Sequence, residues 1–252
     1  YVMSKHDEIA GRLTQEILSG QYRPGERLPS ERDLAARFDA NRGAVREAMK
    51  KLEHLGIAVI QPGGARVAPL GEASLDIVEP MLDIGDIPRR ELIDNVMQVI
   101  DALMQVAVES TVTEATDEQL YELRMLAKPL YDESLDQARL VMARMTLLRA
   151  MMTGSNNLVC QLIAERLFVA MLSIAPKMQA VNKYITVDLA THRIYARQLD
   201  AALATRDLMA IREVSSAISK LNRESVARAY AAFEEAQGAD AGATEAVRES
   251  TG

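Results

Sequence analysis

The fold is decided by residues 28–50, which read LPSERDLAARFDANRGAVREAMK. Ser30 is a favourable N-cap for a short helix, and Asp33 stands three residues further on, where the acid of a capping box is found. A tight turn then leads to Asn41, which can cap a second helix that ends before Gly56. The stretch therefore predicts two helices joined by a tight turn.

The flanking segments complete a small module. Apolar residues recur at every fourth position from Ile9 to Ile17, which predicts a helix over residues 7–18. Beyond the third helix, the pattern changes to that of two short strands joined by a glycine turn at residues 62–64. Three helices and a hairpin within residues 1–70 follow the order of a winged helix-turn-helix domain, which places one helix in the major groove of DNA.

The third helix separates its positive charges from its apolar side. Arg42, Arg46 and Lys50 recur at intervals of four residues, whereas Val45 and Met49 belong to a neighbouring apolar stripe. A basic stripe is often no more than a solvated helix face. Its position directly after a tight turn favours DNA binding, because an arginine fork can meet O6 and N7 of guanine together.

Two further features of this region favour a nucleic-acid partner. Gly43 and Ala44 leave the backbone open at the helix start, where N–H groups attract phosphate. Arg32 opens the preceding helix, and paired glycines precede Arg66 in the expected hairpin. The sequence thus indicates a cationic surface built from two helices and a hairpin.

The motifs GxYxPGxxLPSERxLA (residues 20–35) and NRxxVREA (residues 41–48) resemble the amino-terminal domain of the GntR superfamily of bacterial transcription regulators. Asn41 stands where that family usually has another small polar residue. The resemblance covers about 60 residues and implies that arginines of both helices and the wing-tip glycine contact operator DNA. Close relatives in the fatty-acid-responsive branch have a histidine where Pro62 stands. The candidate DNA-contacting residues are Arg32, Asn41, Arg42, Gly43, Ala44, Arg46, Lys50, Gly63 and Gly64.

The rest of the chain shows helical periodicity and no convincing strand. Proline and glycine-asparagine clusters divide it into segments. The fold class is therefore mainly α, with an amino-terminal winged helix-turn-helix and its short β-hairpin wing, followed by an all-α bundle of six or seven helices. The expected helices span residues 73–84, 88–112, 116–131, 134–152, 156–178, 182–204 and 207–235.

Two motifs in this part, ELIDN (residues 91–95) and RAxxxGSNN (residues 149–157), resemble the FadR-type regulators of the same superfamily, which have an all-helical effector domain. The resemblance and the composition together suggest four segments. These are a DNA-binding domain over residues 1–70, a linker over 71–87, an effector-binding and dimerisation domain over 88–235, and a flexible tail over 236–252.

Many FadR-type regulators hold a divalent metal ion with one aspartate and three histidines. The corresponding positions of this chain fall on Arg144 and Leu148 and near Ala196 and Ile218, and none of these can ligate a metal in the usual way. The whole chain has only three histidines. We therefore expect no structural metal and no other cofactor.

The loss of the metal ligands agrees with the acyl-CoA-sensing members of that branch. A serine used there near the thioester corresponds to Ser225, but Ile100 stands where an arginine helps to hold the ligand. The expected effector is thus an acyl-CoA or another metabolite such as an organic acid, and each arginine of the bundle could instead form an interhelical ion pair. The candidate effector-binding residues are Arg144, Arg149, His192, Tyr195, Asn222 and Ser225.

The composition is that of an ordinary globular protein. The 252 residues are 48% hydrophobic and 26% charged, which suits one large or two modest domains. The single cysteine, Cys160, cannot form an internal disulfide, and no apolar run approaches the ~20 residues of a membrane span, so we expect a cytoplasmic protein. Residues 1–70 carry a net charge of +2 and the remainder −9, so the two parts should meet different partners.

The leading hypothesis is a DNA-binding transcription regulator. A homodimer would bind a palindromic operator, and a small molecule in the helical domain would control that binding. No nucleophile-base pair, phosphate loop or metal-ligand spacing is present, so an enzyme is not expected. The alternative is a ligand-binding protein that does not bind DNA, and salt-sensitive binding to duplex DNA distinguishes the two.

Overall fold

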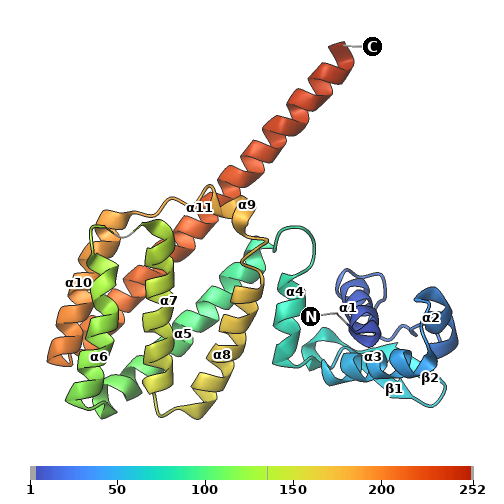
Figure 1. The fold of residues 1–252 in the computed structure, drawn as a ribbon, viewed down its shortest axis with the longest axis horizontal. Helices are drawn as coiled ribbons and strands as arrows, with labels where there is room; N and C mark the ends of the chain where they lie inside the picture. The colour runs from blue at the N-terminus through green and yellow to red at the C-terminus, as the bar shows by residue number, and fades with distance from the viewer. Residues whose placement is uncertain (1–3, 135, 251–252) are drawn as a thin grey trace. The chain divides into compact units, whose positions relative to one another are not determined.

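The computed structural model describes residues 4–134 and 136–250 and is predominantly helical (Figure 1). The chain divides into two compact units. One contains the chain up to Pro88 together with Arg166–Ile174, and the other contains Arg89–Glu165 and the chain from Ala175 onward. Among the described residues, no helix is both long enough and apolar enough to cross a membrane.

The first unit contains the predicted winged helix-turn-helix. Three helices come first, a two-stranded antiparallel sheet follows, and short helical turns end the unit's amino-terminal part. Its elements are α1 (Lys5–Leu18), α2 (Glu31–Arg37), α3 (Arg42–His54), β1 (Ala58–Gln61), β2 (Gly64–Val67), the 3-10 turns η1 (Leu70–Glu72) and η2 (Leu75–Ile77), and α4 (Val78–Leu82).

The predicted N-caps set the helix starts. The Ser30 hydroxyl accepts a hydrogen bond from the Asp33 backbone N–H at 3.2 Å, and Asn41 Oδ1 accepts one from the Ala44 N–H at 2.8 Å. Helix α1 begins two residues earlier than predicted, because Ser4 provides a cap of the same kind. Both helix starts in the deciding stretch are therefore confirmed.

The apolar stripes of α1 and α3 meet in the core of this unit. Ile9 and Leu13 of α1 are fully buried, and so are Val45 and Leu52 of α3. Burial of this kind contributes about 1.5–3 kcal/mol for each large side chain. The packing fixes which side of α3 faces inward, and so leaves its other side for solvent.

The wing is a tight hairpin. Strands β1 and β2 pair antiparallel with Gln61 opposite Gly64, so Pro62 and Gly63 form the two-residue loop. Gly63 has φ +93°, and the ring of a proline such as Pro62 fixes φ at about −65°. A type II turn combines these two values at its central positions. Pro62 and Gly63 thus occupy the two central positions of the wing turn.

Gly56 makes the sharp change of direction between α3 and β1. Its φ is +72°, and a Cβ atom at this position would lie 2.7 Å from the carbonyl oxygen of Glu72 and 2.9 Å from the Cα atom of Ala73. Both the backbone conformation and the close approach exclude a side chain. The contact also brings the segment after β2 against the end of α3.

The prediction of a helix over residues 73–84 was wrong. The chain instead forms η1, η2 and the short helix α4. Ala73 and Ser74 have extended backbone conformations, and the Ser74 N–H donates to the Leu55 carbonyl at 3.0 Å. This tertiary hydrogen bond holds the chain out of the helical conformation.

The second unit contains most of the predicted helical bundle, although Arg166–Ile174, which the prediction placed in the bundle, belongs to the first unit. Helix α5 packs against α7 and α11, and α10 packs against α6 and α11 (Figure 1). The elements of this part of the chain are α5 (Arg90–Glu114), α6 (Asp117–Ala127), the 3-10 turn η3 (Lys128–Tyr131), α7 (Gln137–Gly154), α8 (Leu158–Ser173, shared between the two units), α9 (Gln179–Asn182), α10 (Leu189–Thr205) and α11 (Leu208–Ser250).

Two predicted boundaries of the bundle differ from the structure. Helix α10 begins at Leu189 and not near residue 182, because Asp188 is its N-cap and accepts from the Thr191 N–H at 3.0 Å. Helix α11 continues to Ser250, whereas the sequence predicted its end near residue 235 and a flexible tail beyond. Glycine in a helix costs only about 1 kcal/mol relative to alanine, and this stretch is rich in alanine.

Replacing Gly56 by alanine should destabilise the first unit. Gly56→Ala is expected to lower the free energy of unfolding by about 1–3 kcal/mol, because it combines a positive φ with a backbone clash. Gly11→Ala is the matched control, since Gly11 lies in α1 with no atom within 4 Å of an added Cβ. The control should be stabilised by about 0.5–1 kcal/mol. Chemical denaturation that gave both variants the same stability would contradict this account of the turn.

Candidate functional site

Helix α3 presents its basic stripe to solvent. Val45, Met49 and Leu52 are buried, and Arg42 and Arg46 are exposed. Arg42 forms no ion pair with any acid in the described part of the chain, so its guanidinium is available to a ligand. The separation of charged and apolar sides predicted for this helix is confirmed.

Arg46 is exposed but not free. Its Nε atom donates to both carboxylate oxygens of Glu31, at 3.0 and 2.9 Å, and Glu31 is the first residue of α2. The hydrogen bond and the negative charge of Glu31 raise the pKa of Arg46, so the guanidinium stays protonated. The Arg46 side chain is 64% exposed, and its two terminal nitrogens remain open to a further partner.

The other two predicted cations lie in similar surroundings. Arg32 is 81% exposed, with its Nε atom 3.6 Å from the carboxylate of Asp33. Lys50 is exposed and forms an ion pair of 2.9 Å with Glu47, one turn away on the same helix. Exposed pairs of this kind are weak and are screened by salt, so phosphate groups can compete for the cations.

The start of α3 depends on three of the predicted residues. Asn41 uses its side-chain oxygen to cap the helix. A Cβ at Gly43 would lie 3.1 Å from that oxygen, so glycine leaves room for the cap. Ala44 is half-buried and packs against the core of the unit. The structure thus gives all three residues a local structural role.

The wing glycines lie next to an arginine that the sequence analysis did not single out. The Arg27 guanidinium donates to the Gly63 carbonyl oxygen, and a Cβ at Gly64 would lie 3.1 Å from Arg27 Nε. In return, Arg66 of β2 donates to the Gly25 carbonyl at 2.9 Å. Both arginines are exposed, so Arg66 of the wing and the neighbouring Arg27 add two cations to the surface of this unit. The residue pattern gave no signal for Arg27, because its role depends on a contact across 36 positions.

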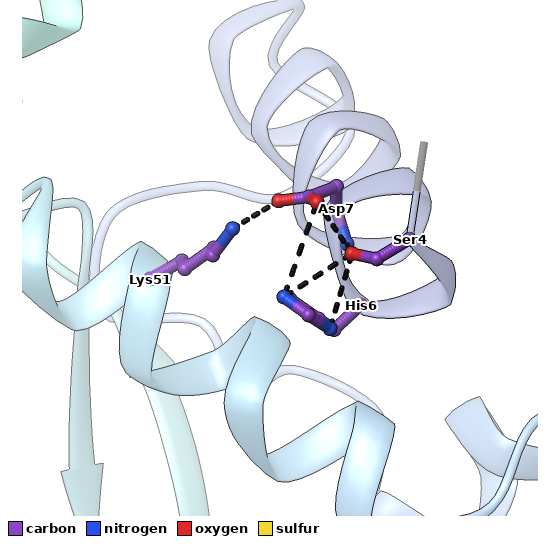
Figure 2. A network of polar contacts seen from close by, with 4 residues as sticks. All are labelled: Ser4, His6, Asp7 and Lys51. Atoms are coloured by element: carbon purple, nitrogen blue, oxygen red, sulfur yellow. Dashed lines mark hydrogen bonds and ion pairs between the residues drawn. The ribbon is translucent and has the colours of Figure 1, made fainter. Parts of the chain in front are cut away.

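A separate polar network joins α1 to α3 (Figure 2). Lys51 donates to the carboxylate of Asp7, which also accepts from the Ser4 hydroxyl, and His6 lies beside them. These hydrogen bonds, with that from Lys51 the largest cause, lower the pKa of Asp7 to about 2. Lys51 is nine residues after Arg42, which places it on the opposite side of the helix. Its charge therefore serves the contact between helices.

The bundle contains a half-buried arginine whose hydrogen-bonding partner is uncharged. Arg144 of α7 donates to the side-chain oxygen of Asn222 of α11, which is a neutral partner. Burial lowers the pKa of Arg144 to about 10, and the charge of Asp101 on α5 acts against this shift. No carboxylate in the described residues is in hydrogen-bonding contact with this guanidinium.

Two other titratable groups belong to the same cluster. His192 of α10 is 6% exposed, and burial together with the nearby Arg144 charge lowers its pKa. Asp101 forms an ion pair with Arg223, which also lies 3.8 Å from Asp94. Burial raises the pKa of Asp101, although hydrogen bonds and the arginine charges partly offset this. The sequence analysis missed Asp101 and Arg223, because residues more than 100 positions apart meet only in the folded bundle.

The remaining candidate effector residues do not all join this cluster. Arg149 is exposed and pairs with Glu165 at 2.7 Å, which is the interhelical ion pair considered as its alternative role. Ser225 is buried and donates to the Thr186 carbonyl at 2.8 Å, and Tyr195 is half-buried. The structure therefore brings together Arg144, Asn222 and His192 and leaves Arg149 at the surface.

The bundle offers no alternative metal site within the residues that are described. No three or more histidine, cysteine, aspartate and glutamate side chains gather there in a way that could hold a metal ion. Cys160 is buried, its pKa is raised by burial, and its thiol donates to the Leu103 carbonyl at 3.4 Å. It is thus a packing residue.

Comparison with known proteins gives a family match for the amino-terminal part of the chain. Residues 5–67 match the family described as "Bacterial regulatory proteins, gntR family". The uncharacterized HTH-type transcriptional regulator YieP of Escherichia coli (strain K12) is 45% identical over 62 residues, which are 24% of this chain and 27% of YieP. The uncharacterized HTH-type transcriptional regulator YdcR of the same strain is 29% identical over 178 residues, or 69% of this chain and 36% of YdcR. The matched region is thus about a quarter to a third of the length of these relatives.

The similarity to solved structures extends further along the chain. The structure of Lar, which controls the expression of the Listeria monocytogenes agr system and mediates virulence, aligns with 91% of this chain and 98% of its own. The TM-score is 0.55 at 17% sequence identity, so this similarity shows a shared fold and nothing more. The motifs, the helix order and the wing agree with the family match at the amino terminus. The amino-terminal domain of this chain therefore belongs to the gntR family of bacterial regulatory proteins.

Proposed function

We propose that this protein is a transcription regulator that binds operator DNA through α3 and the wing. The observation that supports this most directly is the exposed basic side of α3, with Arg42 unpaired and Arg46 held by its Nε atom only. The buried stripe of the same helix fixes the direction of these side chains. Helix α3 would lie in the major groove, where arginine reads guanine through O6 and N7.

The other exposed cations suit phosphate contacts. Arg32 and Lys50 flank the two central arginines, and the start of α3 offers backbone N–H groups. Gly63 and Gly64 let the wing approach the duplex closely, with Arg27 and Arg66 beside them. Phosphate contacts of this kind fix the position of the protein on DNA, and the base contacts of α3 supply the sequence preference.

Operator binding by a homodimer is the second part of the proposal. Helix-turn-helix proteins commonly bind as dimers to palindromic sites, with half-sites roughly one helical turn apart or less. The resemblance to FadR-type regulators supports the same arrangement. Two copies of the DNA-binding domain would then double the number of cations that meet the duplex.

The third part of the proposal is control by an anionic effector in the bundle. Arg144 supports it, because its half-buried guanidinium has a neutral amide as its hydrogen-bonding partner in the described chain and can donate to a ligand carboxylate. A ligand that prefers one conformation of the dimer shifts operator affinity by that same preference. An organic acid needs only the cluster around Arg144, whereas an acyl-CoA would also require space beside Ser225.

Replacing Arg46 by alanine should weaken operator binding. The operator is first selected by the parent protein from random duplexes, and affinity is then measured by mobility shift. Arg46→Ala is expected to lower affinity roughly 10- to 100-fold by removing a base contact, without a change in fold. Lys51→Ala is the control, because it removes a cation from the opposite side of the same helix. Equal affinities of Arg46→Ala and the parent would show that this helix does not read DNA.

A thermal-shift screen tests the effector site. Short mono-, di- and tricarboxylates and acyl-CoAs are added separately to the parent, and at least one should raise its melting temperature. Arg144→Met should abolish that shift, because it removes the guanidinium that would bind the carboxylate. Arg149→Met should retain it, because Arg149 is exposed and paired with Glu165. A ligand that stabilises Arg144→Met as well as the parent would place the effector elsewhere.

The purified protein should contain no stoichiometric metal. The positions that hold metal ligands in many FadR-type regulators carry Arg144 and apolar residues here, and a guanidinium cannot serve as a usual metal ligand. Elemental analysis is expected to find far less than one zinc, nickel or manganese ion per chain. About one ion per chain would contradict the prediction.

A further inference from the structure

The contact between Glu31 and Arg46 links the two helices of the helix-turn-helix at their exposed side. Glu31 is 42% exposed, and its carboxylate meets the Nε atom of Arg46 with both oxygens. The two residues are fifteen positions apart and lie on α2 and α3. Within the described chain, no other acid forms an ion pair with Arg46.

The atoms used in this contact leave a particular set of donors open. A guanidinium has five N–H donors, one on Nε and two on each terminal nitrogen. Glu31 engages the Nε donor, so the donors of the two terminal nitrogens are left without a partner in the described chain. Two terminal nitrogens side by side form the fork that can meet O6 and N7 of one guanine.

We propose that Glu31 is a positioning residue that determines the sequence specificity of Arg46. The proposal rests on the proposed function, that is, on DNA binding by α3. Fixing the guanidinium of an arginine in one orientation costs conformational entropy. Because the contact with Glu31 already restricts Arg46 in the free protein, less entropy is lost when Arg46 binds DNA. Glu31 thus holds the fork of Arg46 in one orientation in the free protein.

The negative charge of Glu31 adds a second effect. A carboxylate repels the DNA backbone, so the pair as a whole is attracted to phosphate less than a lone arginine would be. Arg46 released from Glu31 could swing to a phosphate, where it would bind every sequence equally. Glu31 therefore increases the preference of Arg46 for one base and lowers the affinity of the protein for DNA of any sequence.

Arg42 and the Lys50–Glu47 pair of α3 can be compared with the Arg46–Glu31 pair. Arg42 has no acidic partner in the part of the chain that is described, so its preference should not depend on Glu31. Lys50 is paired with Glu47, an exposed acid on the same helix. Glu47→Gln removes one negative charge close to the basic stripe without touching Arg46, so it serves as a matched control for charge alone.

The test uses duplexes with a randomised core, from which the parent and each variant enrich their preferred sequences. The parent and Arg46→Ala together identify the base pair that Arg46 reads. Glu31→Gln should lose its preference at that base pair, from roughly 10-fold or more to under about 3-fold, and should bind non-specific duplex as tightly as the parent or more tightly. Glu47→Gln should keep the parent's preference at every position.

Glu31→Asp provides a second variant that keeps the charge. Its carboxylate is one methylene shorter and should not reach Nε of Arg46 in the same way, so a similar loss at the same base pair is expected. The double variant Glu31→Gln, Arg46→Ala should behave as Arg46→Ala alone. Circular dichroism and thermal melting establish that each variant is folded before its sequence preference is measured.

Two results would overturn the proposal. One is an unchanged preference of folded Glu31→Gln and Glu31→Asp at the base pair that Arg46 reads. The other is a further loss of preference when Glu31→Gln is added to Arg46→Ala, since Glu31 would then read a base directly. A parent protein that enriches no sequence would instead contradict the proposed function, so the two failures can be told apart.

Discussion

The burial of one side of α3 against α1 is the constraint on which the rest of the DNA-binding domain depends. Val45 and Leu52 are fully buried against a core that includes Ile9 and Leu13. Rotation of α3 about its axis would expose these side chains at a cost of several kcal/mol. The basic side of the helix has no such packing, and its orientation follows from the burial of the opposite side. At Gly56, which follows α3, the segment after β2 packs closely against the chain.

Arg144 of the bundle differs from the arginines of the amino-terminal unit. In the amino-terminal unit the arginines are exposed, and their acidic partners contact only some of their donors, so they remain available to a polyanion such as DNA. In the bundle, Arg144 is half-buried, and burial lowers its pKa to about 10. An exposed ion pair is weak and easily exchanged, whereas a guanidinium held partly out of water gains more from a partner of opposite charge. This contrast fits a protein in which one unit binds a large anion and the other binds a small one.

Local sequence signals predicted the DNA-binding domain well. The caps at Ser30 and Asn41 and the glycine turn of the wing depend on a few neighbouring residues, and each appears in the structure as expected. The prediction of a helix over residues 73–84 was wrong, because a hydrogen bond from the Ser74 N–H to the Leu55 carbonyl overrides the local helix propensity. The pairing of Glu31 with Arg46, and that of Arg144 with Asn222, join residues on different helices. Periodicity within one helix carries no information about such contacts. It therefore identified Arg46 but not its pairing with Glu31, and Arg144 and Asn222 were both candidate effector residues without a predicted contact between them.

The central claim is that the exposed cations of α3 and its neighbours bind duplex DNA. It is tested most directly by fluorescence anisotropy of a labelled random-sequence duplex titrated with the parent protein at salt concentrations between about 50 and 200 mM. Arg27, Arg32, Lys50 and Arg66 would each release counterions from phosphate, so affinity should fall by at least roughly 100-fold across this range. Absence of binding at low salt, or an affinity that does not change with salt, would contradict the account.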